Sequence, residues 1–441
     1  MQNLQQPPAE GKFTLLRDRR FLWLMCAWFS AVMGQQIALI TMPWLVLQLG
    51  GDGFALGMVI TAMELPRAVF IIIGGALVDR HSPRLVLKWS LFICAALVIA
   101  VGLAVLSGNL QLWMLYLFAV AIGVINAFTG PSAAALLPET VAAERLQSAN
   151  AFFMGINQFS LFIGPTLAGL LIVLPGLQAN SSPASNTAHG LGLAFILSAA
   201  CFVTAGFALT RMASGSAGKT ARHPSTSNIL HSITQGARWA WSDVTLRSLF
   251  LYWAAIAFLT AGPIQVGLPL LVKEQMHLGA NYFGILISSQ GAGSLAGMAL
   301  LGLLPRWALG RLGVMVFCAD GIMGLIIINL GMVHHFTTGA ILMFSIGLFS
   351  GLVQVRLIVW IQSRIPAHMR GRVMSFLMFM MAVVTPLSTS LVGFLIVYAS
   401  TRNLYLGAGV LLIAIALFAL SSANLRNIKA VENTTSAEEP A

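Results

Sequence analysis

The chain has 441 residues, of which 58% are hydrophobic and only 8% are charged, and its mean hydropathy is +0.87. This composition excludes an ordinary soluble domain and predicts a polytopic membrane protein. The net charge of +11 would suggest a nucleic-acid partner in a soluble protein. In a membrane protein it instead reflects basic residues in the inner loops, so we expect no nucleic acid as a partner.

Apolar runs of about 20 residues, long enough to cross a bilayer as a helix, recur along the whole chain. The first six are predicted near 21–48, 55–78, 85–106, 111–136, 148–174 and 190–211. The second six are predicted near 247–272, 281–304, 312–333, 338–362, 372–399 and 403–422. We therefore expect an all-α membrane protein of twelve transmembrane helices, arranged as two six-helix pseudo-repeats.

The predicted spans divide the chain into five parts: an N-terminal segment over 1–20, a first bundle over 21–211, a linker over 212–246, a second bundle over 247–422 and a tail over 423–441. Within the linker, apolar residues among polar ones over 228–243 indicate an amphipathic helix on the inner membrane surface. A plain linker is the alternative.

The basic residues predict the orientation of the spans. With the N-terminus inside, 20 of the 24 Lys and Arg residues fall on the cytoplasmic side. Lys273 and Arg402 fall outside, and Arg67 and Arg356 fall within spans. Both termini are therefore expected to be cytoplasmic.

The sequence contains none of the motifs that would indicate an enzyme or an ATP-driven pump. It lacks a Gly-x-x-x-x-Gly-Lys-Ser/Thr loop, a His-Glu-x-x-His helix and a Cys-x-x-Cys pair. Its four cysteines lie far apart in apolar runs, which indicates neither a disulfide framework nor a thiol metal site. We expect no enzymatic activity, cofactor or metal.

Glu64 and Arg67 place two opposite charges near the middle of the predicted second span. Their i, i+3 spacing makes them neighbours on a helix. An ionisable group at this depth costs roughly 2.5–3.5 kcal/mol, so both should face the protein interior or a water-filled cavity. Together they are candidates for proton coupling, and a permanent structural pair is the alternative. Asp320 in the ninth span is another coupling candidate, with a buried hydrogen-bonding role as its alternative.

Further polar and aromatic side chains within the spans are candidates for a substrate cavity. Uncharged polar groups also join helices by hydrogen bonds, which is the alternative for several of them. The candidate cavity residues are Gln35, Gln36, Asn126, Asn157, Gln158, Gln265, Gln290, Gln354, Arg356 and Trp360.

The segment Gly75-x-x-x-Asp79-Arg80-x-x-x-Arg84 resembles the loop signature of the major facilitator superfamily. The resemblance implies that these residues form a cytoplasmic gate, in which the acidic residue and the following basic residues latch the N-terminal half. Ser82 and Pro83 replace the usual glycine and arginine. A tight turn held inside by its positive charge is the alternative.

The fifth span carries Gly155, Gly164, Pro165 and Gly169, a pattern that resembles the glycine and proline signature of antiporters in the same superfamily. The resemblance implies export. Glycine and proline also permit close helix packing and a bend, which would explain these residues without any functional role.

Short segments such as Met42-Pro43-Trp44 and Arg370-Gly371-Arg372 resemble those of the branch that contains enterobactin-type siderophore exporters and macrolide efflux proteins. The fourth span lacks the buried arginine of many drug and proton antiporters, with Phe118 and Ala119 near its expected position.

The resemblance implies a secondary active transporter that exports small amphiphilic molecules such as drugs by proton antiport and alternating access. Siderophore export is one alternative, favoured if Arg67 and Arg356 make the cavity cationic. A non-transporting membrane receptor or scaffold is an alternative from another class. The expected partners are a small-molecule substrate, protons and membrane lipid, for a monomer in the inner (plasma) membrane of a bacterium.

Overall fold

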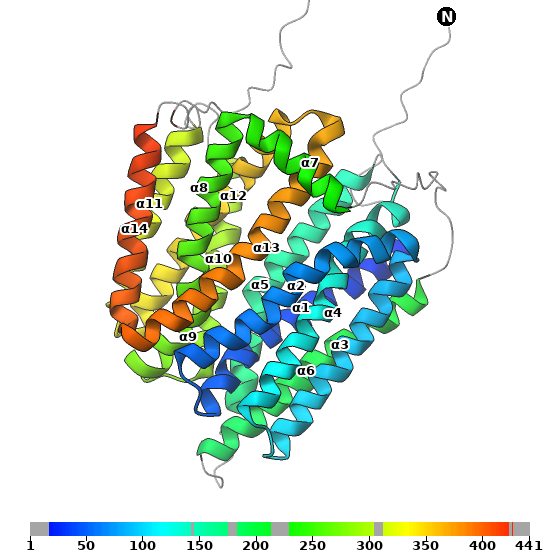
Figure 1. The fold of residues 1–441 in the computed structure, drawn as a ribbon. Helices are drawn as coiled ribbons and strands as arrows, with labels where there is room; N and C mark the ends of the chain where they lie inside the picture. Colours follow the sequence, from blue (N-terminus) through cyan, green and yellow to red (C-terminus); the bar gives the residue numbers. More distant parts are fainter. Residues whose placement is uncertain are drawn as a thin grey trace, which may run out of the picture. The chain divides into compact units, whose positions relative to one another are not determined.

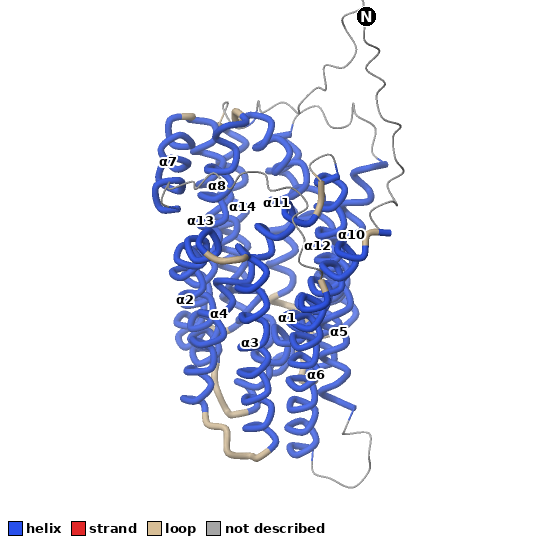
Figure 2. The backbone as a smooth tube through the Cα atoms, turned by 90° about the vertical axis from the view of Figure 1, so that its right-hand side faces the viewer, coloured by secondary structure: helices blue, strands red, loops and turns tan. Residues whose placement is uncertain are grey.

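The computed structural model describes residues 17–142, 145–174, 183–212, 229–303, 312–422 and 426, and all regular secondary structure within these ranges is helical. Twelve helices there are long and apolar enough to cross a membrane, which confirms the predicted fold class. Figure 1 shows the helices and Figure 2 the short connections between many of them.

The first six spans are α1 (Arg19–Gln48), α2 (Gly53–Arg80), α3 (Pro83–Leu106), α4 (Leu112–Thr140), α5 (Leu146–Val173) and α6 (Pro183–Arg211). The seventh is continuous through α8 (Val244–Gly262), η4 (Pro263–Gly267), α9 (Leu268–Leu270) and η5 (Leu271–Gln275). The last five are α10 (Ala280–Leu303), α11 (Leu312–Leu330), α12 (Phe336–Arg364), α13 (Ala367–Tyr398) and α14 (Thr401–Ser421).

The chain forms two compact units by its internal contacts. The first comprises Met1–Met42 and Pro66–Thr226, and the second comprises Pro43–Leu65 and Ser227–Ala441. The end of α1 and the start of α2 therefore pack with the second unit, although they belong to the first six spans. We call residues Pro43–Leu65 the α1–α2 hairpin.

In the first unit, α3 packs along α6 through small residues. A Cβ atom at Gly206 would lie 2.8 Å from the ring of Phe92, so glycine permits this close approach. At one end of the pair, the Arg84 guanidinium donates to the carbonyl oxygens of Leu209 and Thr210 at 2.9 and 3.1 Å. Arg84 thus caps the C-terminal end of α6, where a cation is favourable.

In the second unit, α10 and α12 cross at near backbone contact. Gly293 and Gly297 on α10 face Gly347 and Gly351 on α12, each pair four residues apart, and a Cβ atom at any of the four would collide with the partner backbone. This is the small-residue packing that membrane helices use in place of a hydrophobic driving force. The outer pair α11 and α14 lies side by side in the same unit.

The linker region contains α7 (Ile229–Ser242), close to the helix predicted over 228–243. It packs on α13, where Gly236 lies against the Arg372 backbone, and the Trp241 ring meets Phe376 edge to face at 6.2 Å. The helix therefore belongs to the second unit. Its predicted place on the membrane surface stays a prediction.

Candidate functional site

Asp320 is a buried carboxylate in the middle of α11. Its side chain is only 6% exposed, and the Tyr252 hydroxyl on α8 donates to Oδ2 at 2.7 Å. The Tyr252 ring lies edge-on to Phe317 at 4.7 Å, which fixes the position of the hydroxyl. Within the described ranges Asp320 has no ion pair, and its stabilising partner is the neutral Tyr252 hydroxyl.

The seventh span is irregular in its second half. Two π-helical segments interrupt it, and the candidate cavity residue Gln265 lies in the first of them. Neighbouring helices bond to the backbone at this point: the Gly262 amide donates to Ser388 Oγ at 2.8 Å, and the Tyr405 hydroxyl donates to the Pro263 carbonyl at 2.9 Å. Such π-helical segments are frequent at functional sites.

The α1–α2 hairpin packs on α13 within the second unit. The Thr61 hydroxyl lies 2.8 Å from that of Ser390 and 3.2 Å from that of Thr389. One turn before Thr61, a Cβ atom at Gly57 would lie 2.8 Å from Gly393 Cα. A hydrogen-bonded cluster and a glycine crossing therefore hold α2 against α13.

The same hairpin contacts the seventh and eighth spans. Lys273 Nζ donates to the carbonyl of Leu47 in the last turn of α1 at 2.6 Å. A cation there also interacts favourably with the helix dipole. Trp44 stacks on Phe283 of α10 with ring centroids 6.2 Å apart. Lys273, expected only to be an outer-loop residue, thus joins two helices.

Glu64 and Arg67 are half-buried on α2. The boundary between the two units passes between them, because Leu65 is the last residue of the hairpin and Pro66 begins the next part of the first unit. The other end of the hairpin falls at Pro43, inside α1. Proline removes a helical hydrogen bond, so both boundaries coincide with weak points of a helix.

Arg356 is half-buried on α12, and its Nη1 donates to Met315 Sδ on α11 at 3.1 Å. One turn further along α12, the buried Trp360 ring lies 5.5 Å from Arg364 Cζ. Arg364 in turn bonds Asp243 Oδ2 at 2.9 Å. This row of side chains runs along α12 to its end.

Asp243 also caps α8, accepting from the amides of Thr245 and Leu246. Burial raises the pKa of its carboxyl, but the hydrogen bond and charge of Arg364 and these two amides outweigh it, so the pKa lies below its ordinary value. The carboxylate is therefore ionised at neutral pH and holds Arg364 at the start of α8.

The candidate cavity residues divide between the two units. Gln265, Gln290, Gln354, Arg356 and Trp360 lie in the second. Gln35, Gln36, Asn126, Asn157 and Gln158 lie in the first, where the Asn157 amide donates to the Phe153 carbonyl of its own helix at 3.1 Å. Their assignment to one cavity stays a prediction.

Of the predicted cytoplasmic gate, Arg84 is the member whose contacts are described, and they tie α3 to α6. Helix α2 runs through Gly75, Asp79 and Arg80. The burial and contacts of these three residues lie outside the described part of the structure, so the latch stays a prediction.

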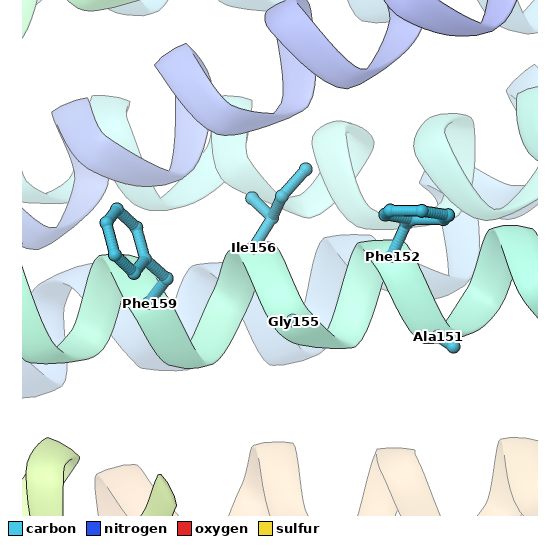
Figure 3. Close-up of a pocket in the computed structure, with 5 residues that line it drawn as sticks. All are labelled: Ala151, Phe152, Gly155, Ile156 and Phe159. Atoms are coloured by element: carbon cyan, nitrogen blue, oxygen red, sulfur yellow. The ribbon is translucent and has the colours of Figure 1, made fainter. Parts of the chain in front are cut away.

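The residues of the glycine and proline pattern in α5 have two different surroundings. Gly164 packs against α1, where its Cβ would lie 2.6 Å from Gln36 Cβ, and Pro165 and Gly169 are buried beside it. Gly155 is exposed, and a Cβ there would have nothing within 4 Å. It instead lines an apolar notch of about 380 Å³ with Ala151, Phe152, Ile156 and Phe159 (Figure 3).

Tyr252, Lys273, Thr61 and Ser390 were not among the predicted site residues. Each is an ordinary residue for a membrane span or its edge, and its partner lies at least 68 residues away. Gly57 and Gly393 are a weak indication of this contact in the sequence, because glycine within a span often marks a close helix crossing. Among the described residues, no cluster of His, Cys, Asp or Glu side chains is suited to hold a metal ion.

Known proteins are similar to this chain over most of its length. Two relatives are described as the multidrug efflux pump Tap. The protein of Mycolicibacterium fortuitum is 24% identical over 416 residues, which cover 92% of this chain and 96% of that protein. The protein of Mycobacterium tuberculosis (strain H37Rv) is 23% identical over 413 residues, which cover 92% and 94%.

Solved transporter structures share the fold. The nucleoside transporter NupG matches with a TM-score of 0.65 at 15% identity, over 90% of this chain and 98% of that one. A bacterial homologue of the iron transporter ferroportin, in an inward-facing state, matches with a TM-score of 0.64 at 18% identity, over 92% and 99%.

The family model of the Major Facilitator Superfamily matches residues 24–389, and the matched relatives are bacterial. These findings agree with the twelve spans. This chain is therefore a multi-pass membrane transporter that belongs to the Major Facilitator Superfamily.

Proposed function

We propose that this transporter exports small amphiphilic molecules in exchange for protons. The observation that carries the proposal is the similarity to multidrug efflux pumps over 92% of the chain. Because the similarity runs through both six-helix halves, it supports a shared transport cycle as well as a shared fold. The siderophore alternative depends on a cavity made cationic by Arg67 and Arg356. The Arg356 guanidinium donates to a methionine sulfur on the neighbouring helix.

Export against a gradient requires an energy source, and the sequence has no nucleotide-binding loop. Two carboxyl groups within spans are suited to carry a proton: Glu64 on α2 and Asp320 on α11. A carboxyl group at this depth is cheap to bury when neutral and costly when charged. Binding and release of its proton therefore favour different arrangements of the surrounding helices.

Alternating access requires contacts that open. We assign this role to the α1–α2 hairpin, which is held to α13 by the Thr61 cluster and to the seventh span by Lys273. The predicted topology places this end of the bundle outside the cell. Pro43 and Pro66 allow the hairpin to bend at its two ends when these contacts break.

Gradient-driven uptake into proteoliposomes tests the proposal. With an acidic lumen, protons leaving the vesicle should drive tetraphenylphosphonium inward, and dissipating the gradient should stop uptake. The Glu64→Gln variant should lower the driven rate more than about tenfold, since its amide cannot carry a proton. Uptake that is unchanged without the gradient would refute proton coupling, and no uptake of any amphiphile by folded protein would refute the export proposal itself.

A further inference from the structure

Tyr252 and Asp320 are a pair of buried polar side chains on two helices of the second unit. Asp320 lies about 12 Å along the axis from Leu312 at the start of α11, and Tyr252 lies about 12 Å from Val244 at the start of α8. The contact is therefore deep within both spans. A carboxyl group at this depth is sensitive to each donor that it has, because charge is costly there.

Tyr252 is the partner of the Asp320 carboxyl among the described residues. The separation of 2.7 Å between the hydroxyl oxygen and Oδ2 is short enough for a hydrogen bond to an ionised carboxylate. The ion pair described in this unit joins Arg364 to Asp243 instead. When Asp320 is ionised, the group that stabilises its charge is therefore one neutral hydroxyl.

Other charged groups near α11 are bonded elsewhere. Arg356 on α12 reaches α11, but it donates to Met315 at 3.1 Å, a residue about 8 Å along the axis from Asp320. No other charged side chain in the described part of the second unit bonds the carboxyl. Besides the pair itself, the charged and titratable side chains on α11 and on the helices packed against it are Arg247, Cys318, Arg356, Arg364, Arg402 and Tyr405.

The tyrosine is held in place by the same helix that carries the carboxyl. Its ring meets Phe317 edge to face with centroids 4.7 Å apart, and Phe317 is fully buried. Phe317 and Asp320 are three residues apart on α11 and so lie on one side of the helix. The hydroxyl therefore stays beside the carboxyl whether Asp320 is ionised or neutral.

The two forms of Asp320 gain different amounts from this bond. A hydrogen bond to an ionised carboxylate is roughly twice as strong as one between neutral groups. The Tyr252 hydroxyl therefore stabilises the ionised form more than the protonated form. Loss of the hydroxyl should let Asp320 keep its proton to a higher pH, because only the ionised form loses a strong bond.

We propose that Tyr252 is a positioning residue for proton exchange at Asp320 and sets the pH at which the exchange occurs. The inference rests on the proposed function and assigns a residue to its proton step. The exchanged proton forms and breaks a bond to a carboxylate oxygen of Asp320, and Tyr252 keeps its own proton in both states. Protonation of Asp320 weakens the bond from Tyr252, so α8 is then held less tightly to α11.

An infrared titration of purified protein in nanodiscs tests the role of Tyr252 without requiring transport. The absorption band of the protonated Asp320 carboxyl is followed as the pH is changed, and its loss in Asp320→Asn identifies it. In Tyr252→Phe, which keeps the ring against Phe317, the midpoint of the titration should rise by about one pH unit. The pH profile of gradient-driven uptake should move in the same direction.

The matched control is Tyr405→Phe. Tyr405 is also a buried tyrosine of the second unit, but its hydroxyl donates to the Pro263 backbone carbonyl at 2.9 Å. The same substitution therefore removes a buried hydrogen bond that no carboxylate accepts, and it should leave the midpoint unchanged. Phe317→Leu is a second test variant, which loosens the Tyr252 ring but keeps its hydroxyl, and it should raise the midpoint by a smaller amount.

The role of Tyr252 and the export proposal fail on different measurements. Export fails if folded, unsubstituted protein moves no amphiphile in proteoliposomes, whatever the infrared titration shows. An unchanged midpoint in Tyr252→Phe overturns the role of Tyr252 even when export is intact, and so does an equal rise in Tyr405→Phe, which would indicate general loosening of the unit. A carboxyl band of Asp320 that does not change with pH in the unsubstituted protein overturns it as well, because Asp320 then exchanges no proton.

Discussion

A disulfide between Thr61→Cys and Ser390→Cys is expected to stop transport completely and reversibly. The two hydroxyl oxygens lie 2.8 Å apart, so sulfur atoms on longer bonds come within reach of a disulfide of about 2.05 Å. The bond would fix the α1–α2 hairpin to α13, and the outer side could then not open. The measurement is gradient-driven uptake before and after oxidation, in a chain whose four native cysteines are replaced.

Each single-cysteine variant, treated with the same oxidant, is the control and should keep its transport rate. Reduction of the double variant should restore transport, which separates arrest by the cross-link from damage by the substitutions. A fully cross-linked protein that transports at the uncross-linked rate would show that the hairpin does not open during the cycle.

Asp320→Asn is expected to give a folded protein that no longer couples transport to the pH gradient. Asparagine has nearly the volume of aspartate, and its carbonyl oxygen can still accept from Tyr252, but it cannot bind and release a proton. The imposed gradient should then accelerate uptake no more than about twofold, against more than about tenfold for the unsubstituted protein. Downhill movement of substrate should persist.

The matched variants separate coupling from structure. Asp320→Leu leaves the buried Tyr252 hydroxyl without its acceptor and should lower stability by about 1–3 kcal/mol. Tyr252→Phe removes the donor while retaining the ring that packs on Phe317. If Asp320→Asn retains full acceleration by the gradient, Asp320 is a structural residue and coupling must rest on Glu64 or another group.

The membrane-crossing helices could be predicted from the sequence because a span is a local property. A run of about 20 apolar residues identifies it without knowledge of its neighbours. The largest difference at the start of a helix is at α6, which begins at Pro183 where the apolar run predicts 190. Helices continue past the hydrocarbon core into polar segments, so hydropathy finds the apolar core of a helix better than its ends.

The partners of the polar residues could not be predicted in the same way. Asp320 was identifiable as an unusual carboxyl in an apolar run, but its donor Tyr252 is 68 residues away on another helix. Lys273 and the carbonyl it binds are 226 residues apart. Which helix faces which is decided by packing of whole helices, and single-sequence patterns carry little of that information.

The α5 glycines illustrate the same limit. In the sequence Gly155 and Gly164 belong to one pattern with one implied role. In the structure a Cβ atom at Gly164 would lie against Gln36, whereas a Cβ atom at Gly155 would have no neighbour within 4 Å. Spacing along the helix identified both residues, but only their surroundings separate close packing from a notch.

The central claim is exchange of an amphiphile for protons, and the most direct test is the luminal pH of proteoliposomes without an imposed gradient. Adding tetraphenylphosphonium outside should drive protons out as the cation enters, so the lumen becomes more alkaline. The change should be absent in Glu64→Gln and Asp320→Asn. Entry of the cation with a constant luminal pH would contradict antiport and show that the protein moves its substrate without protons.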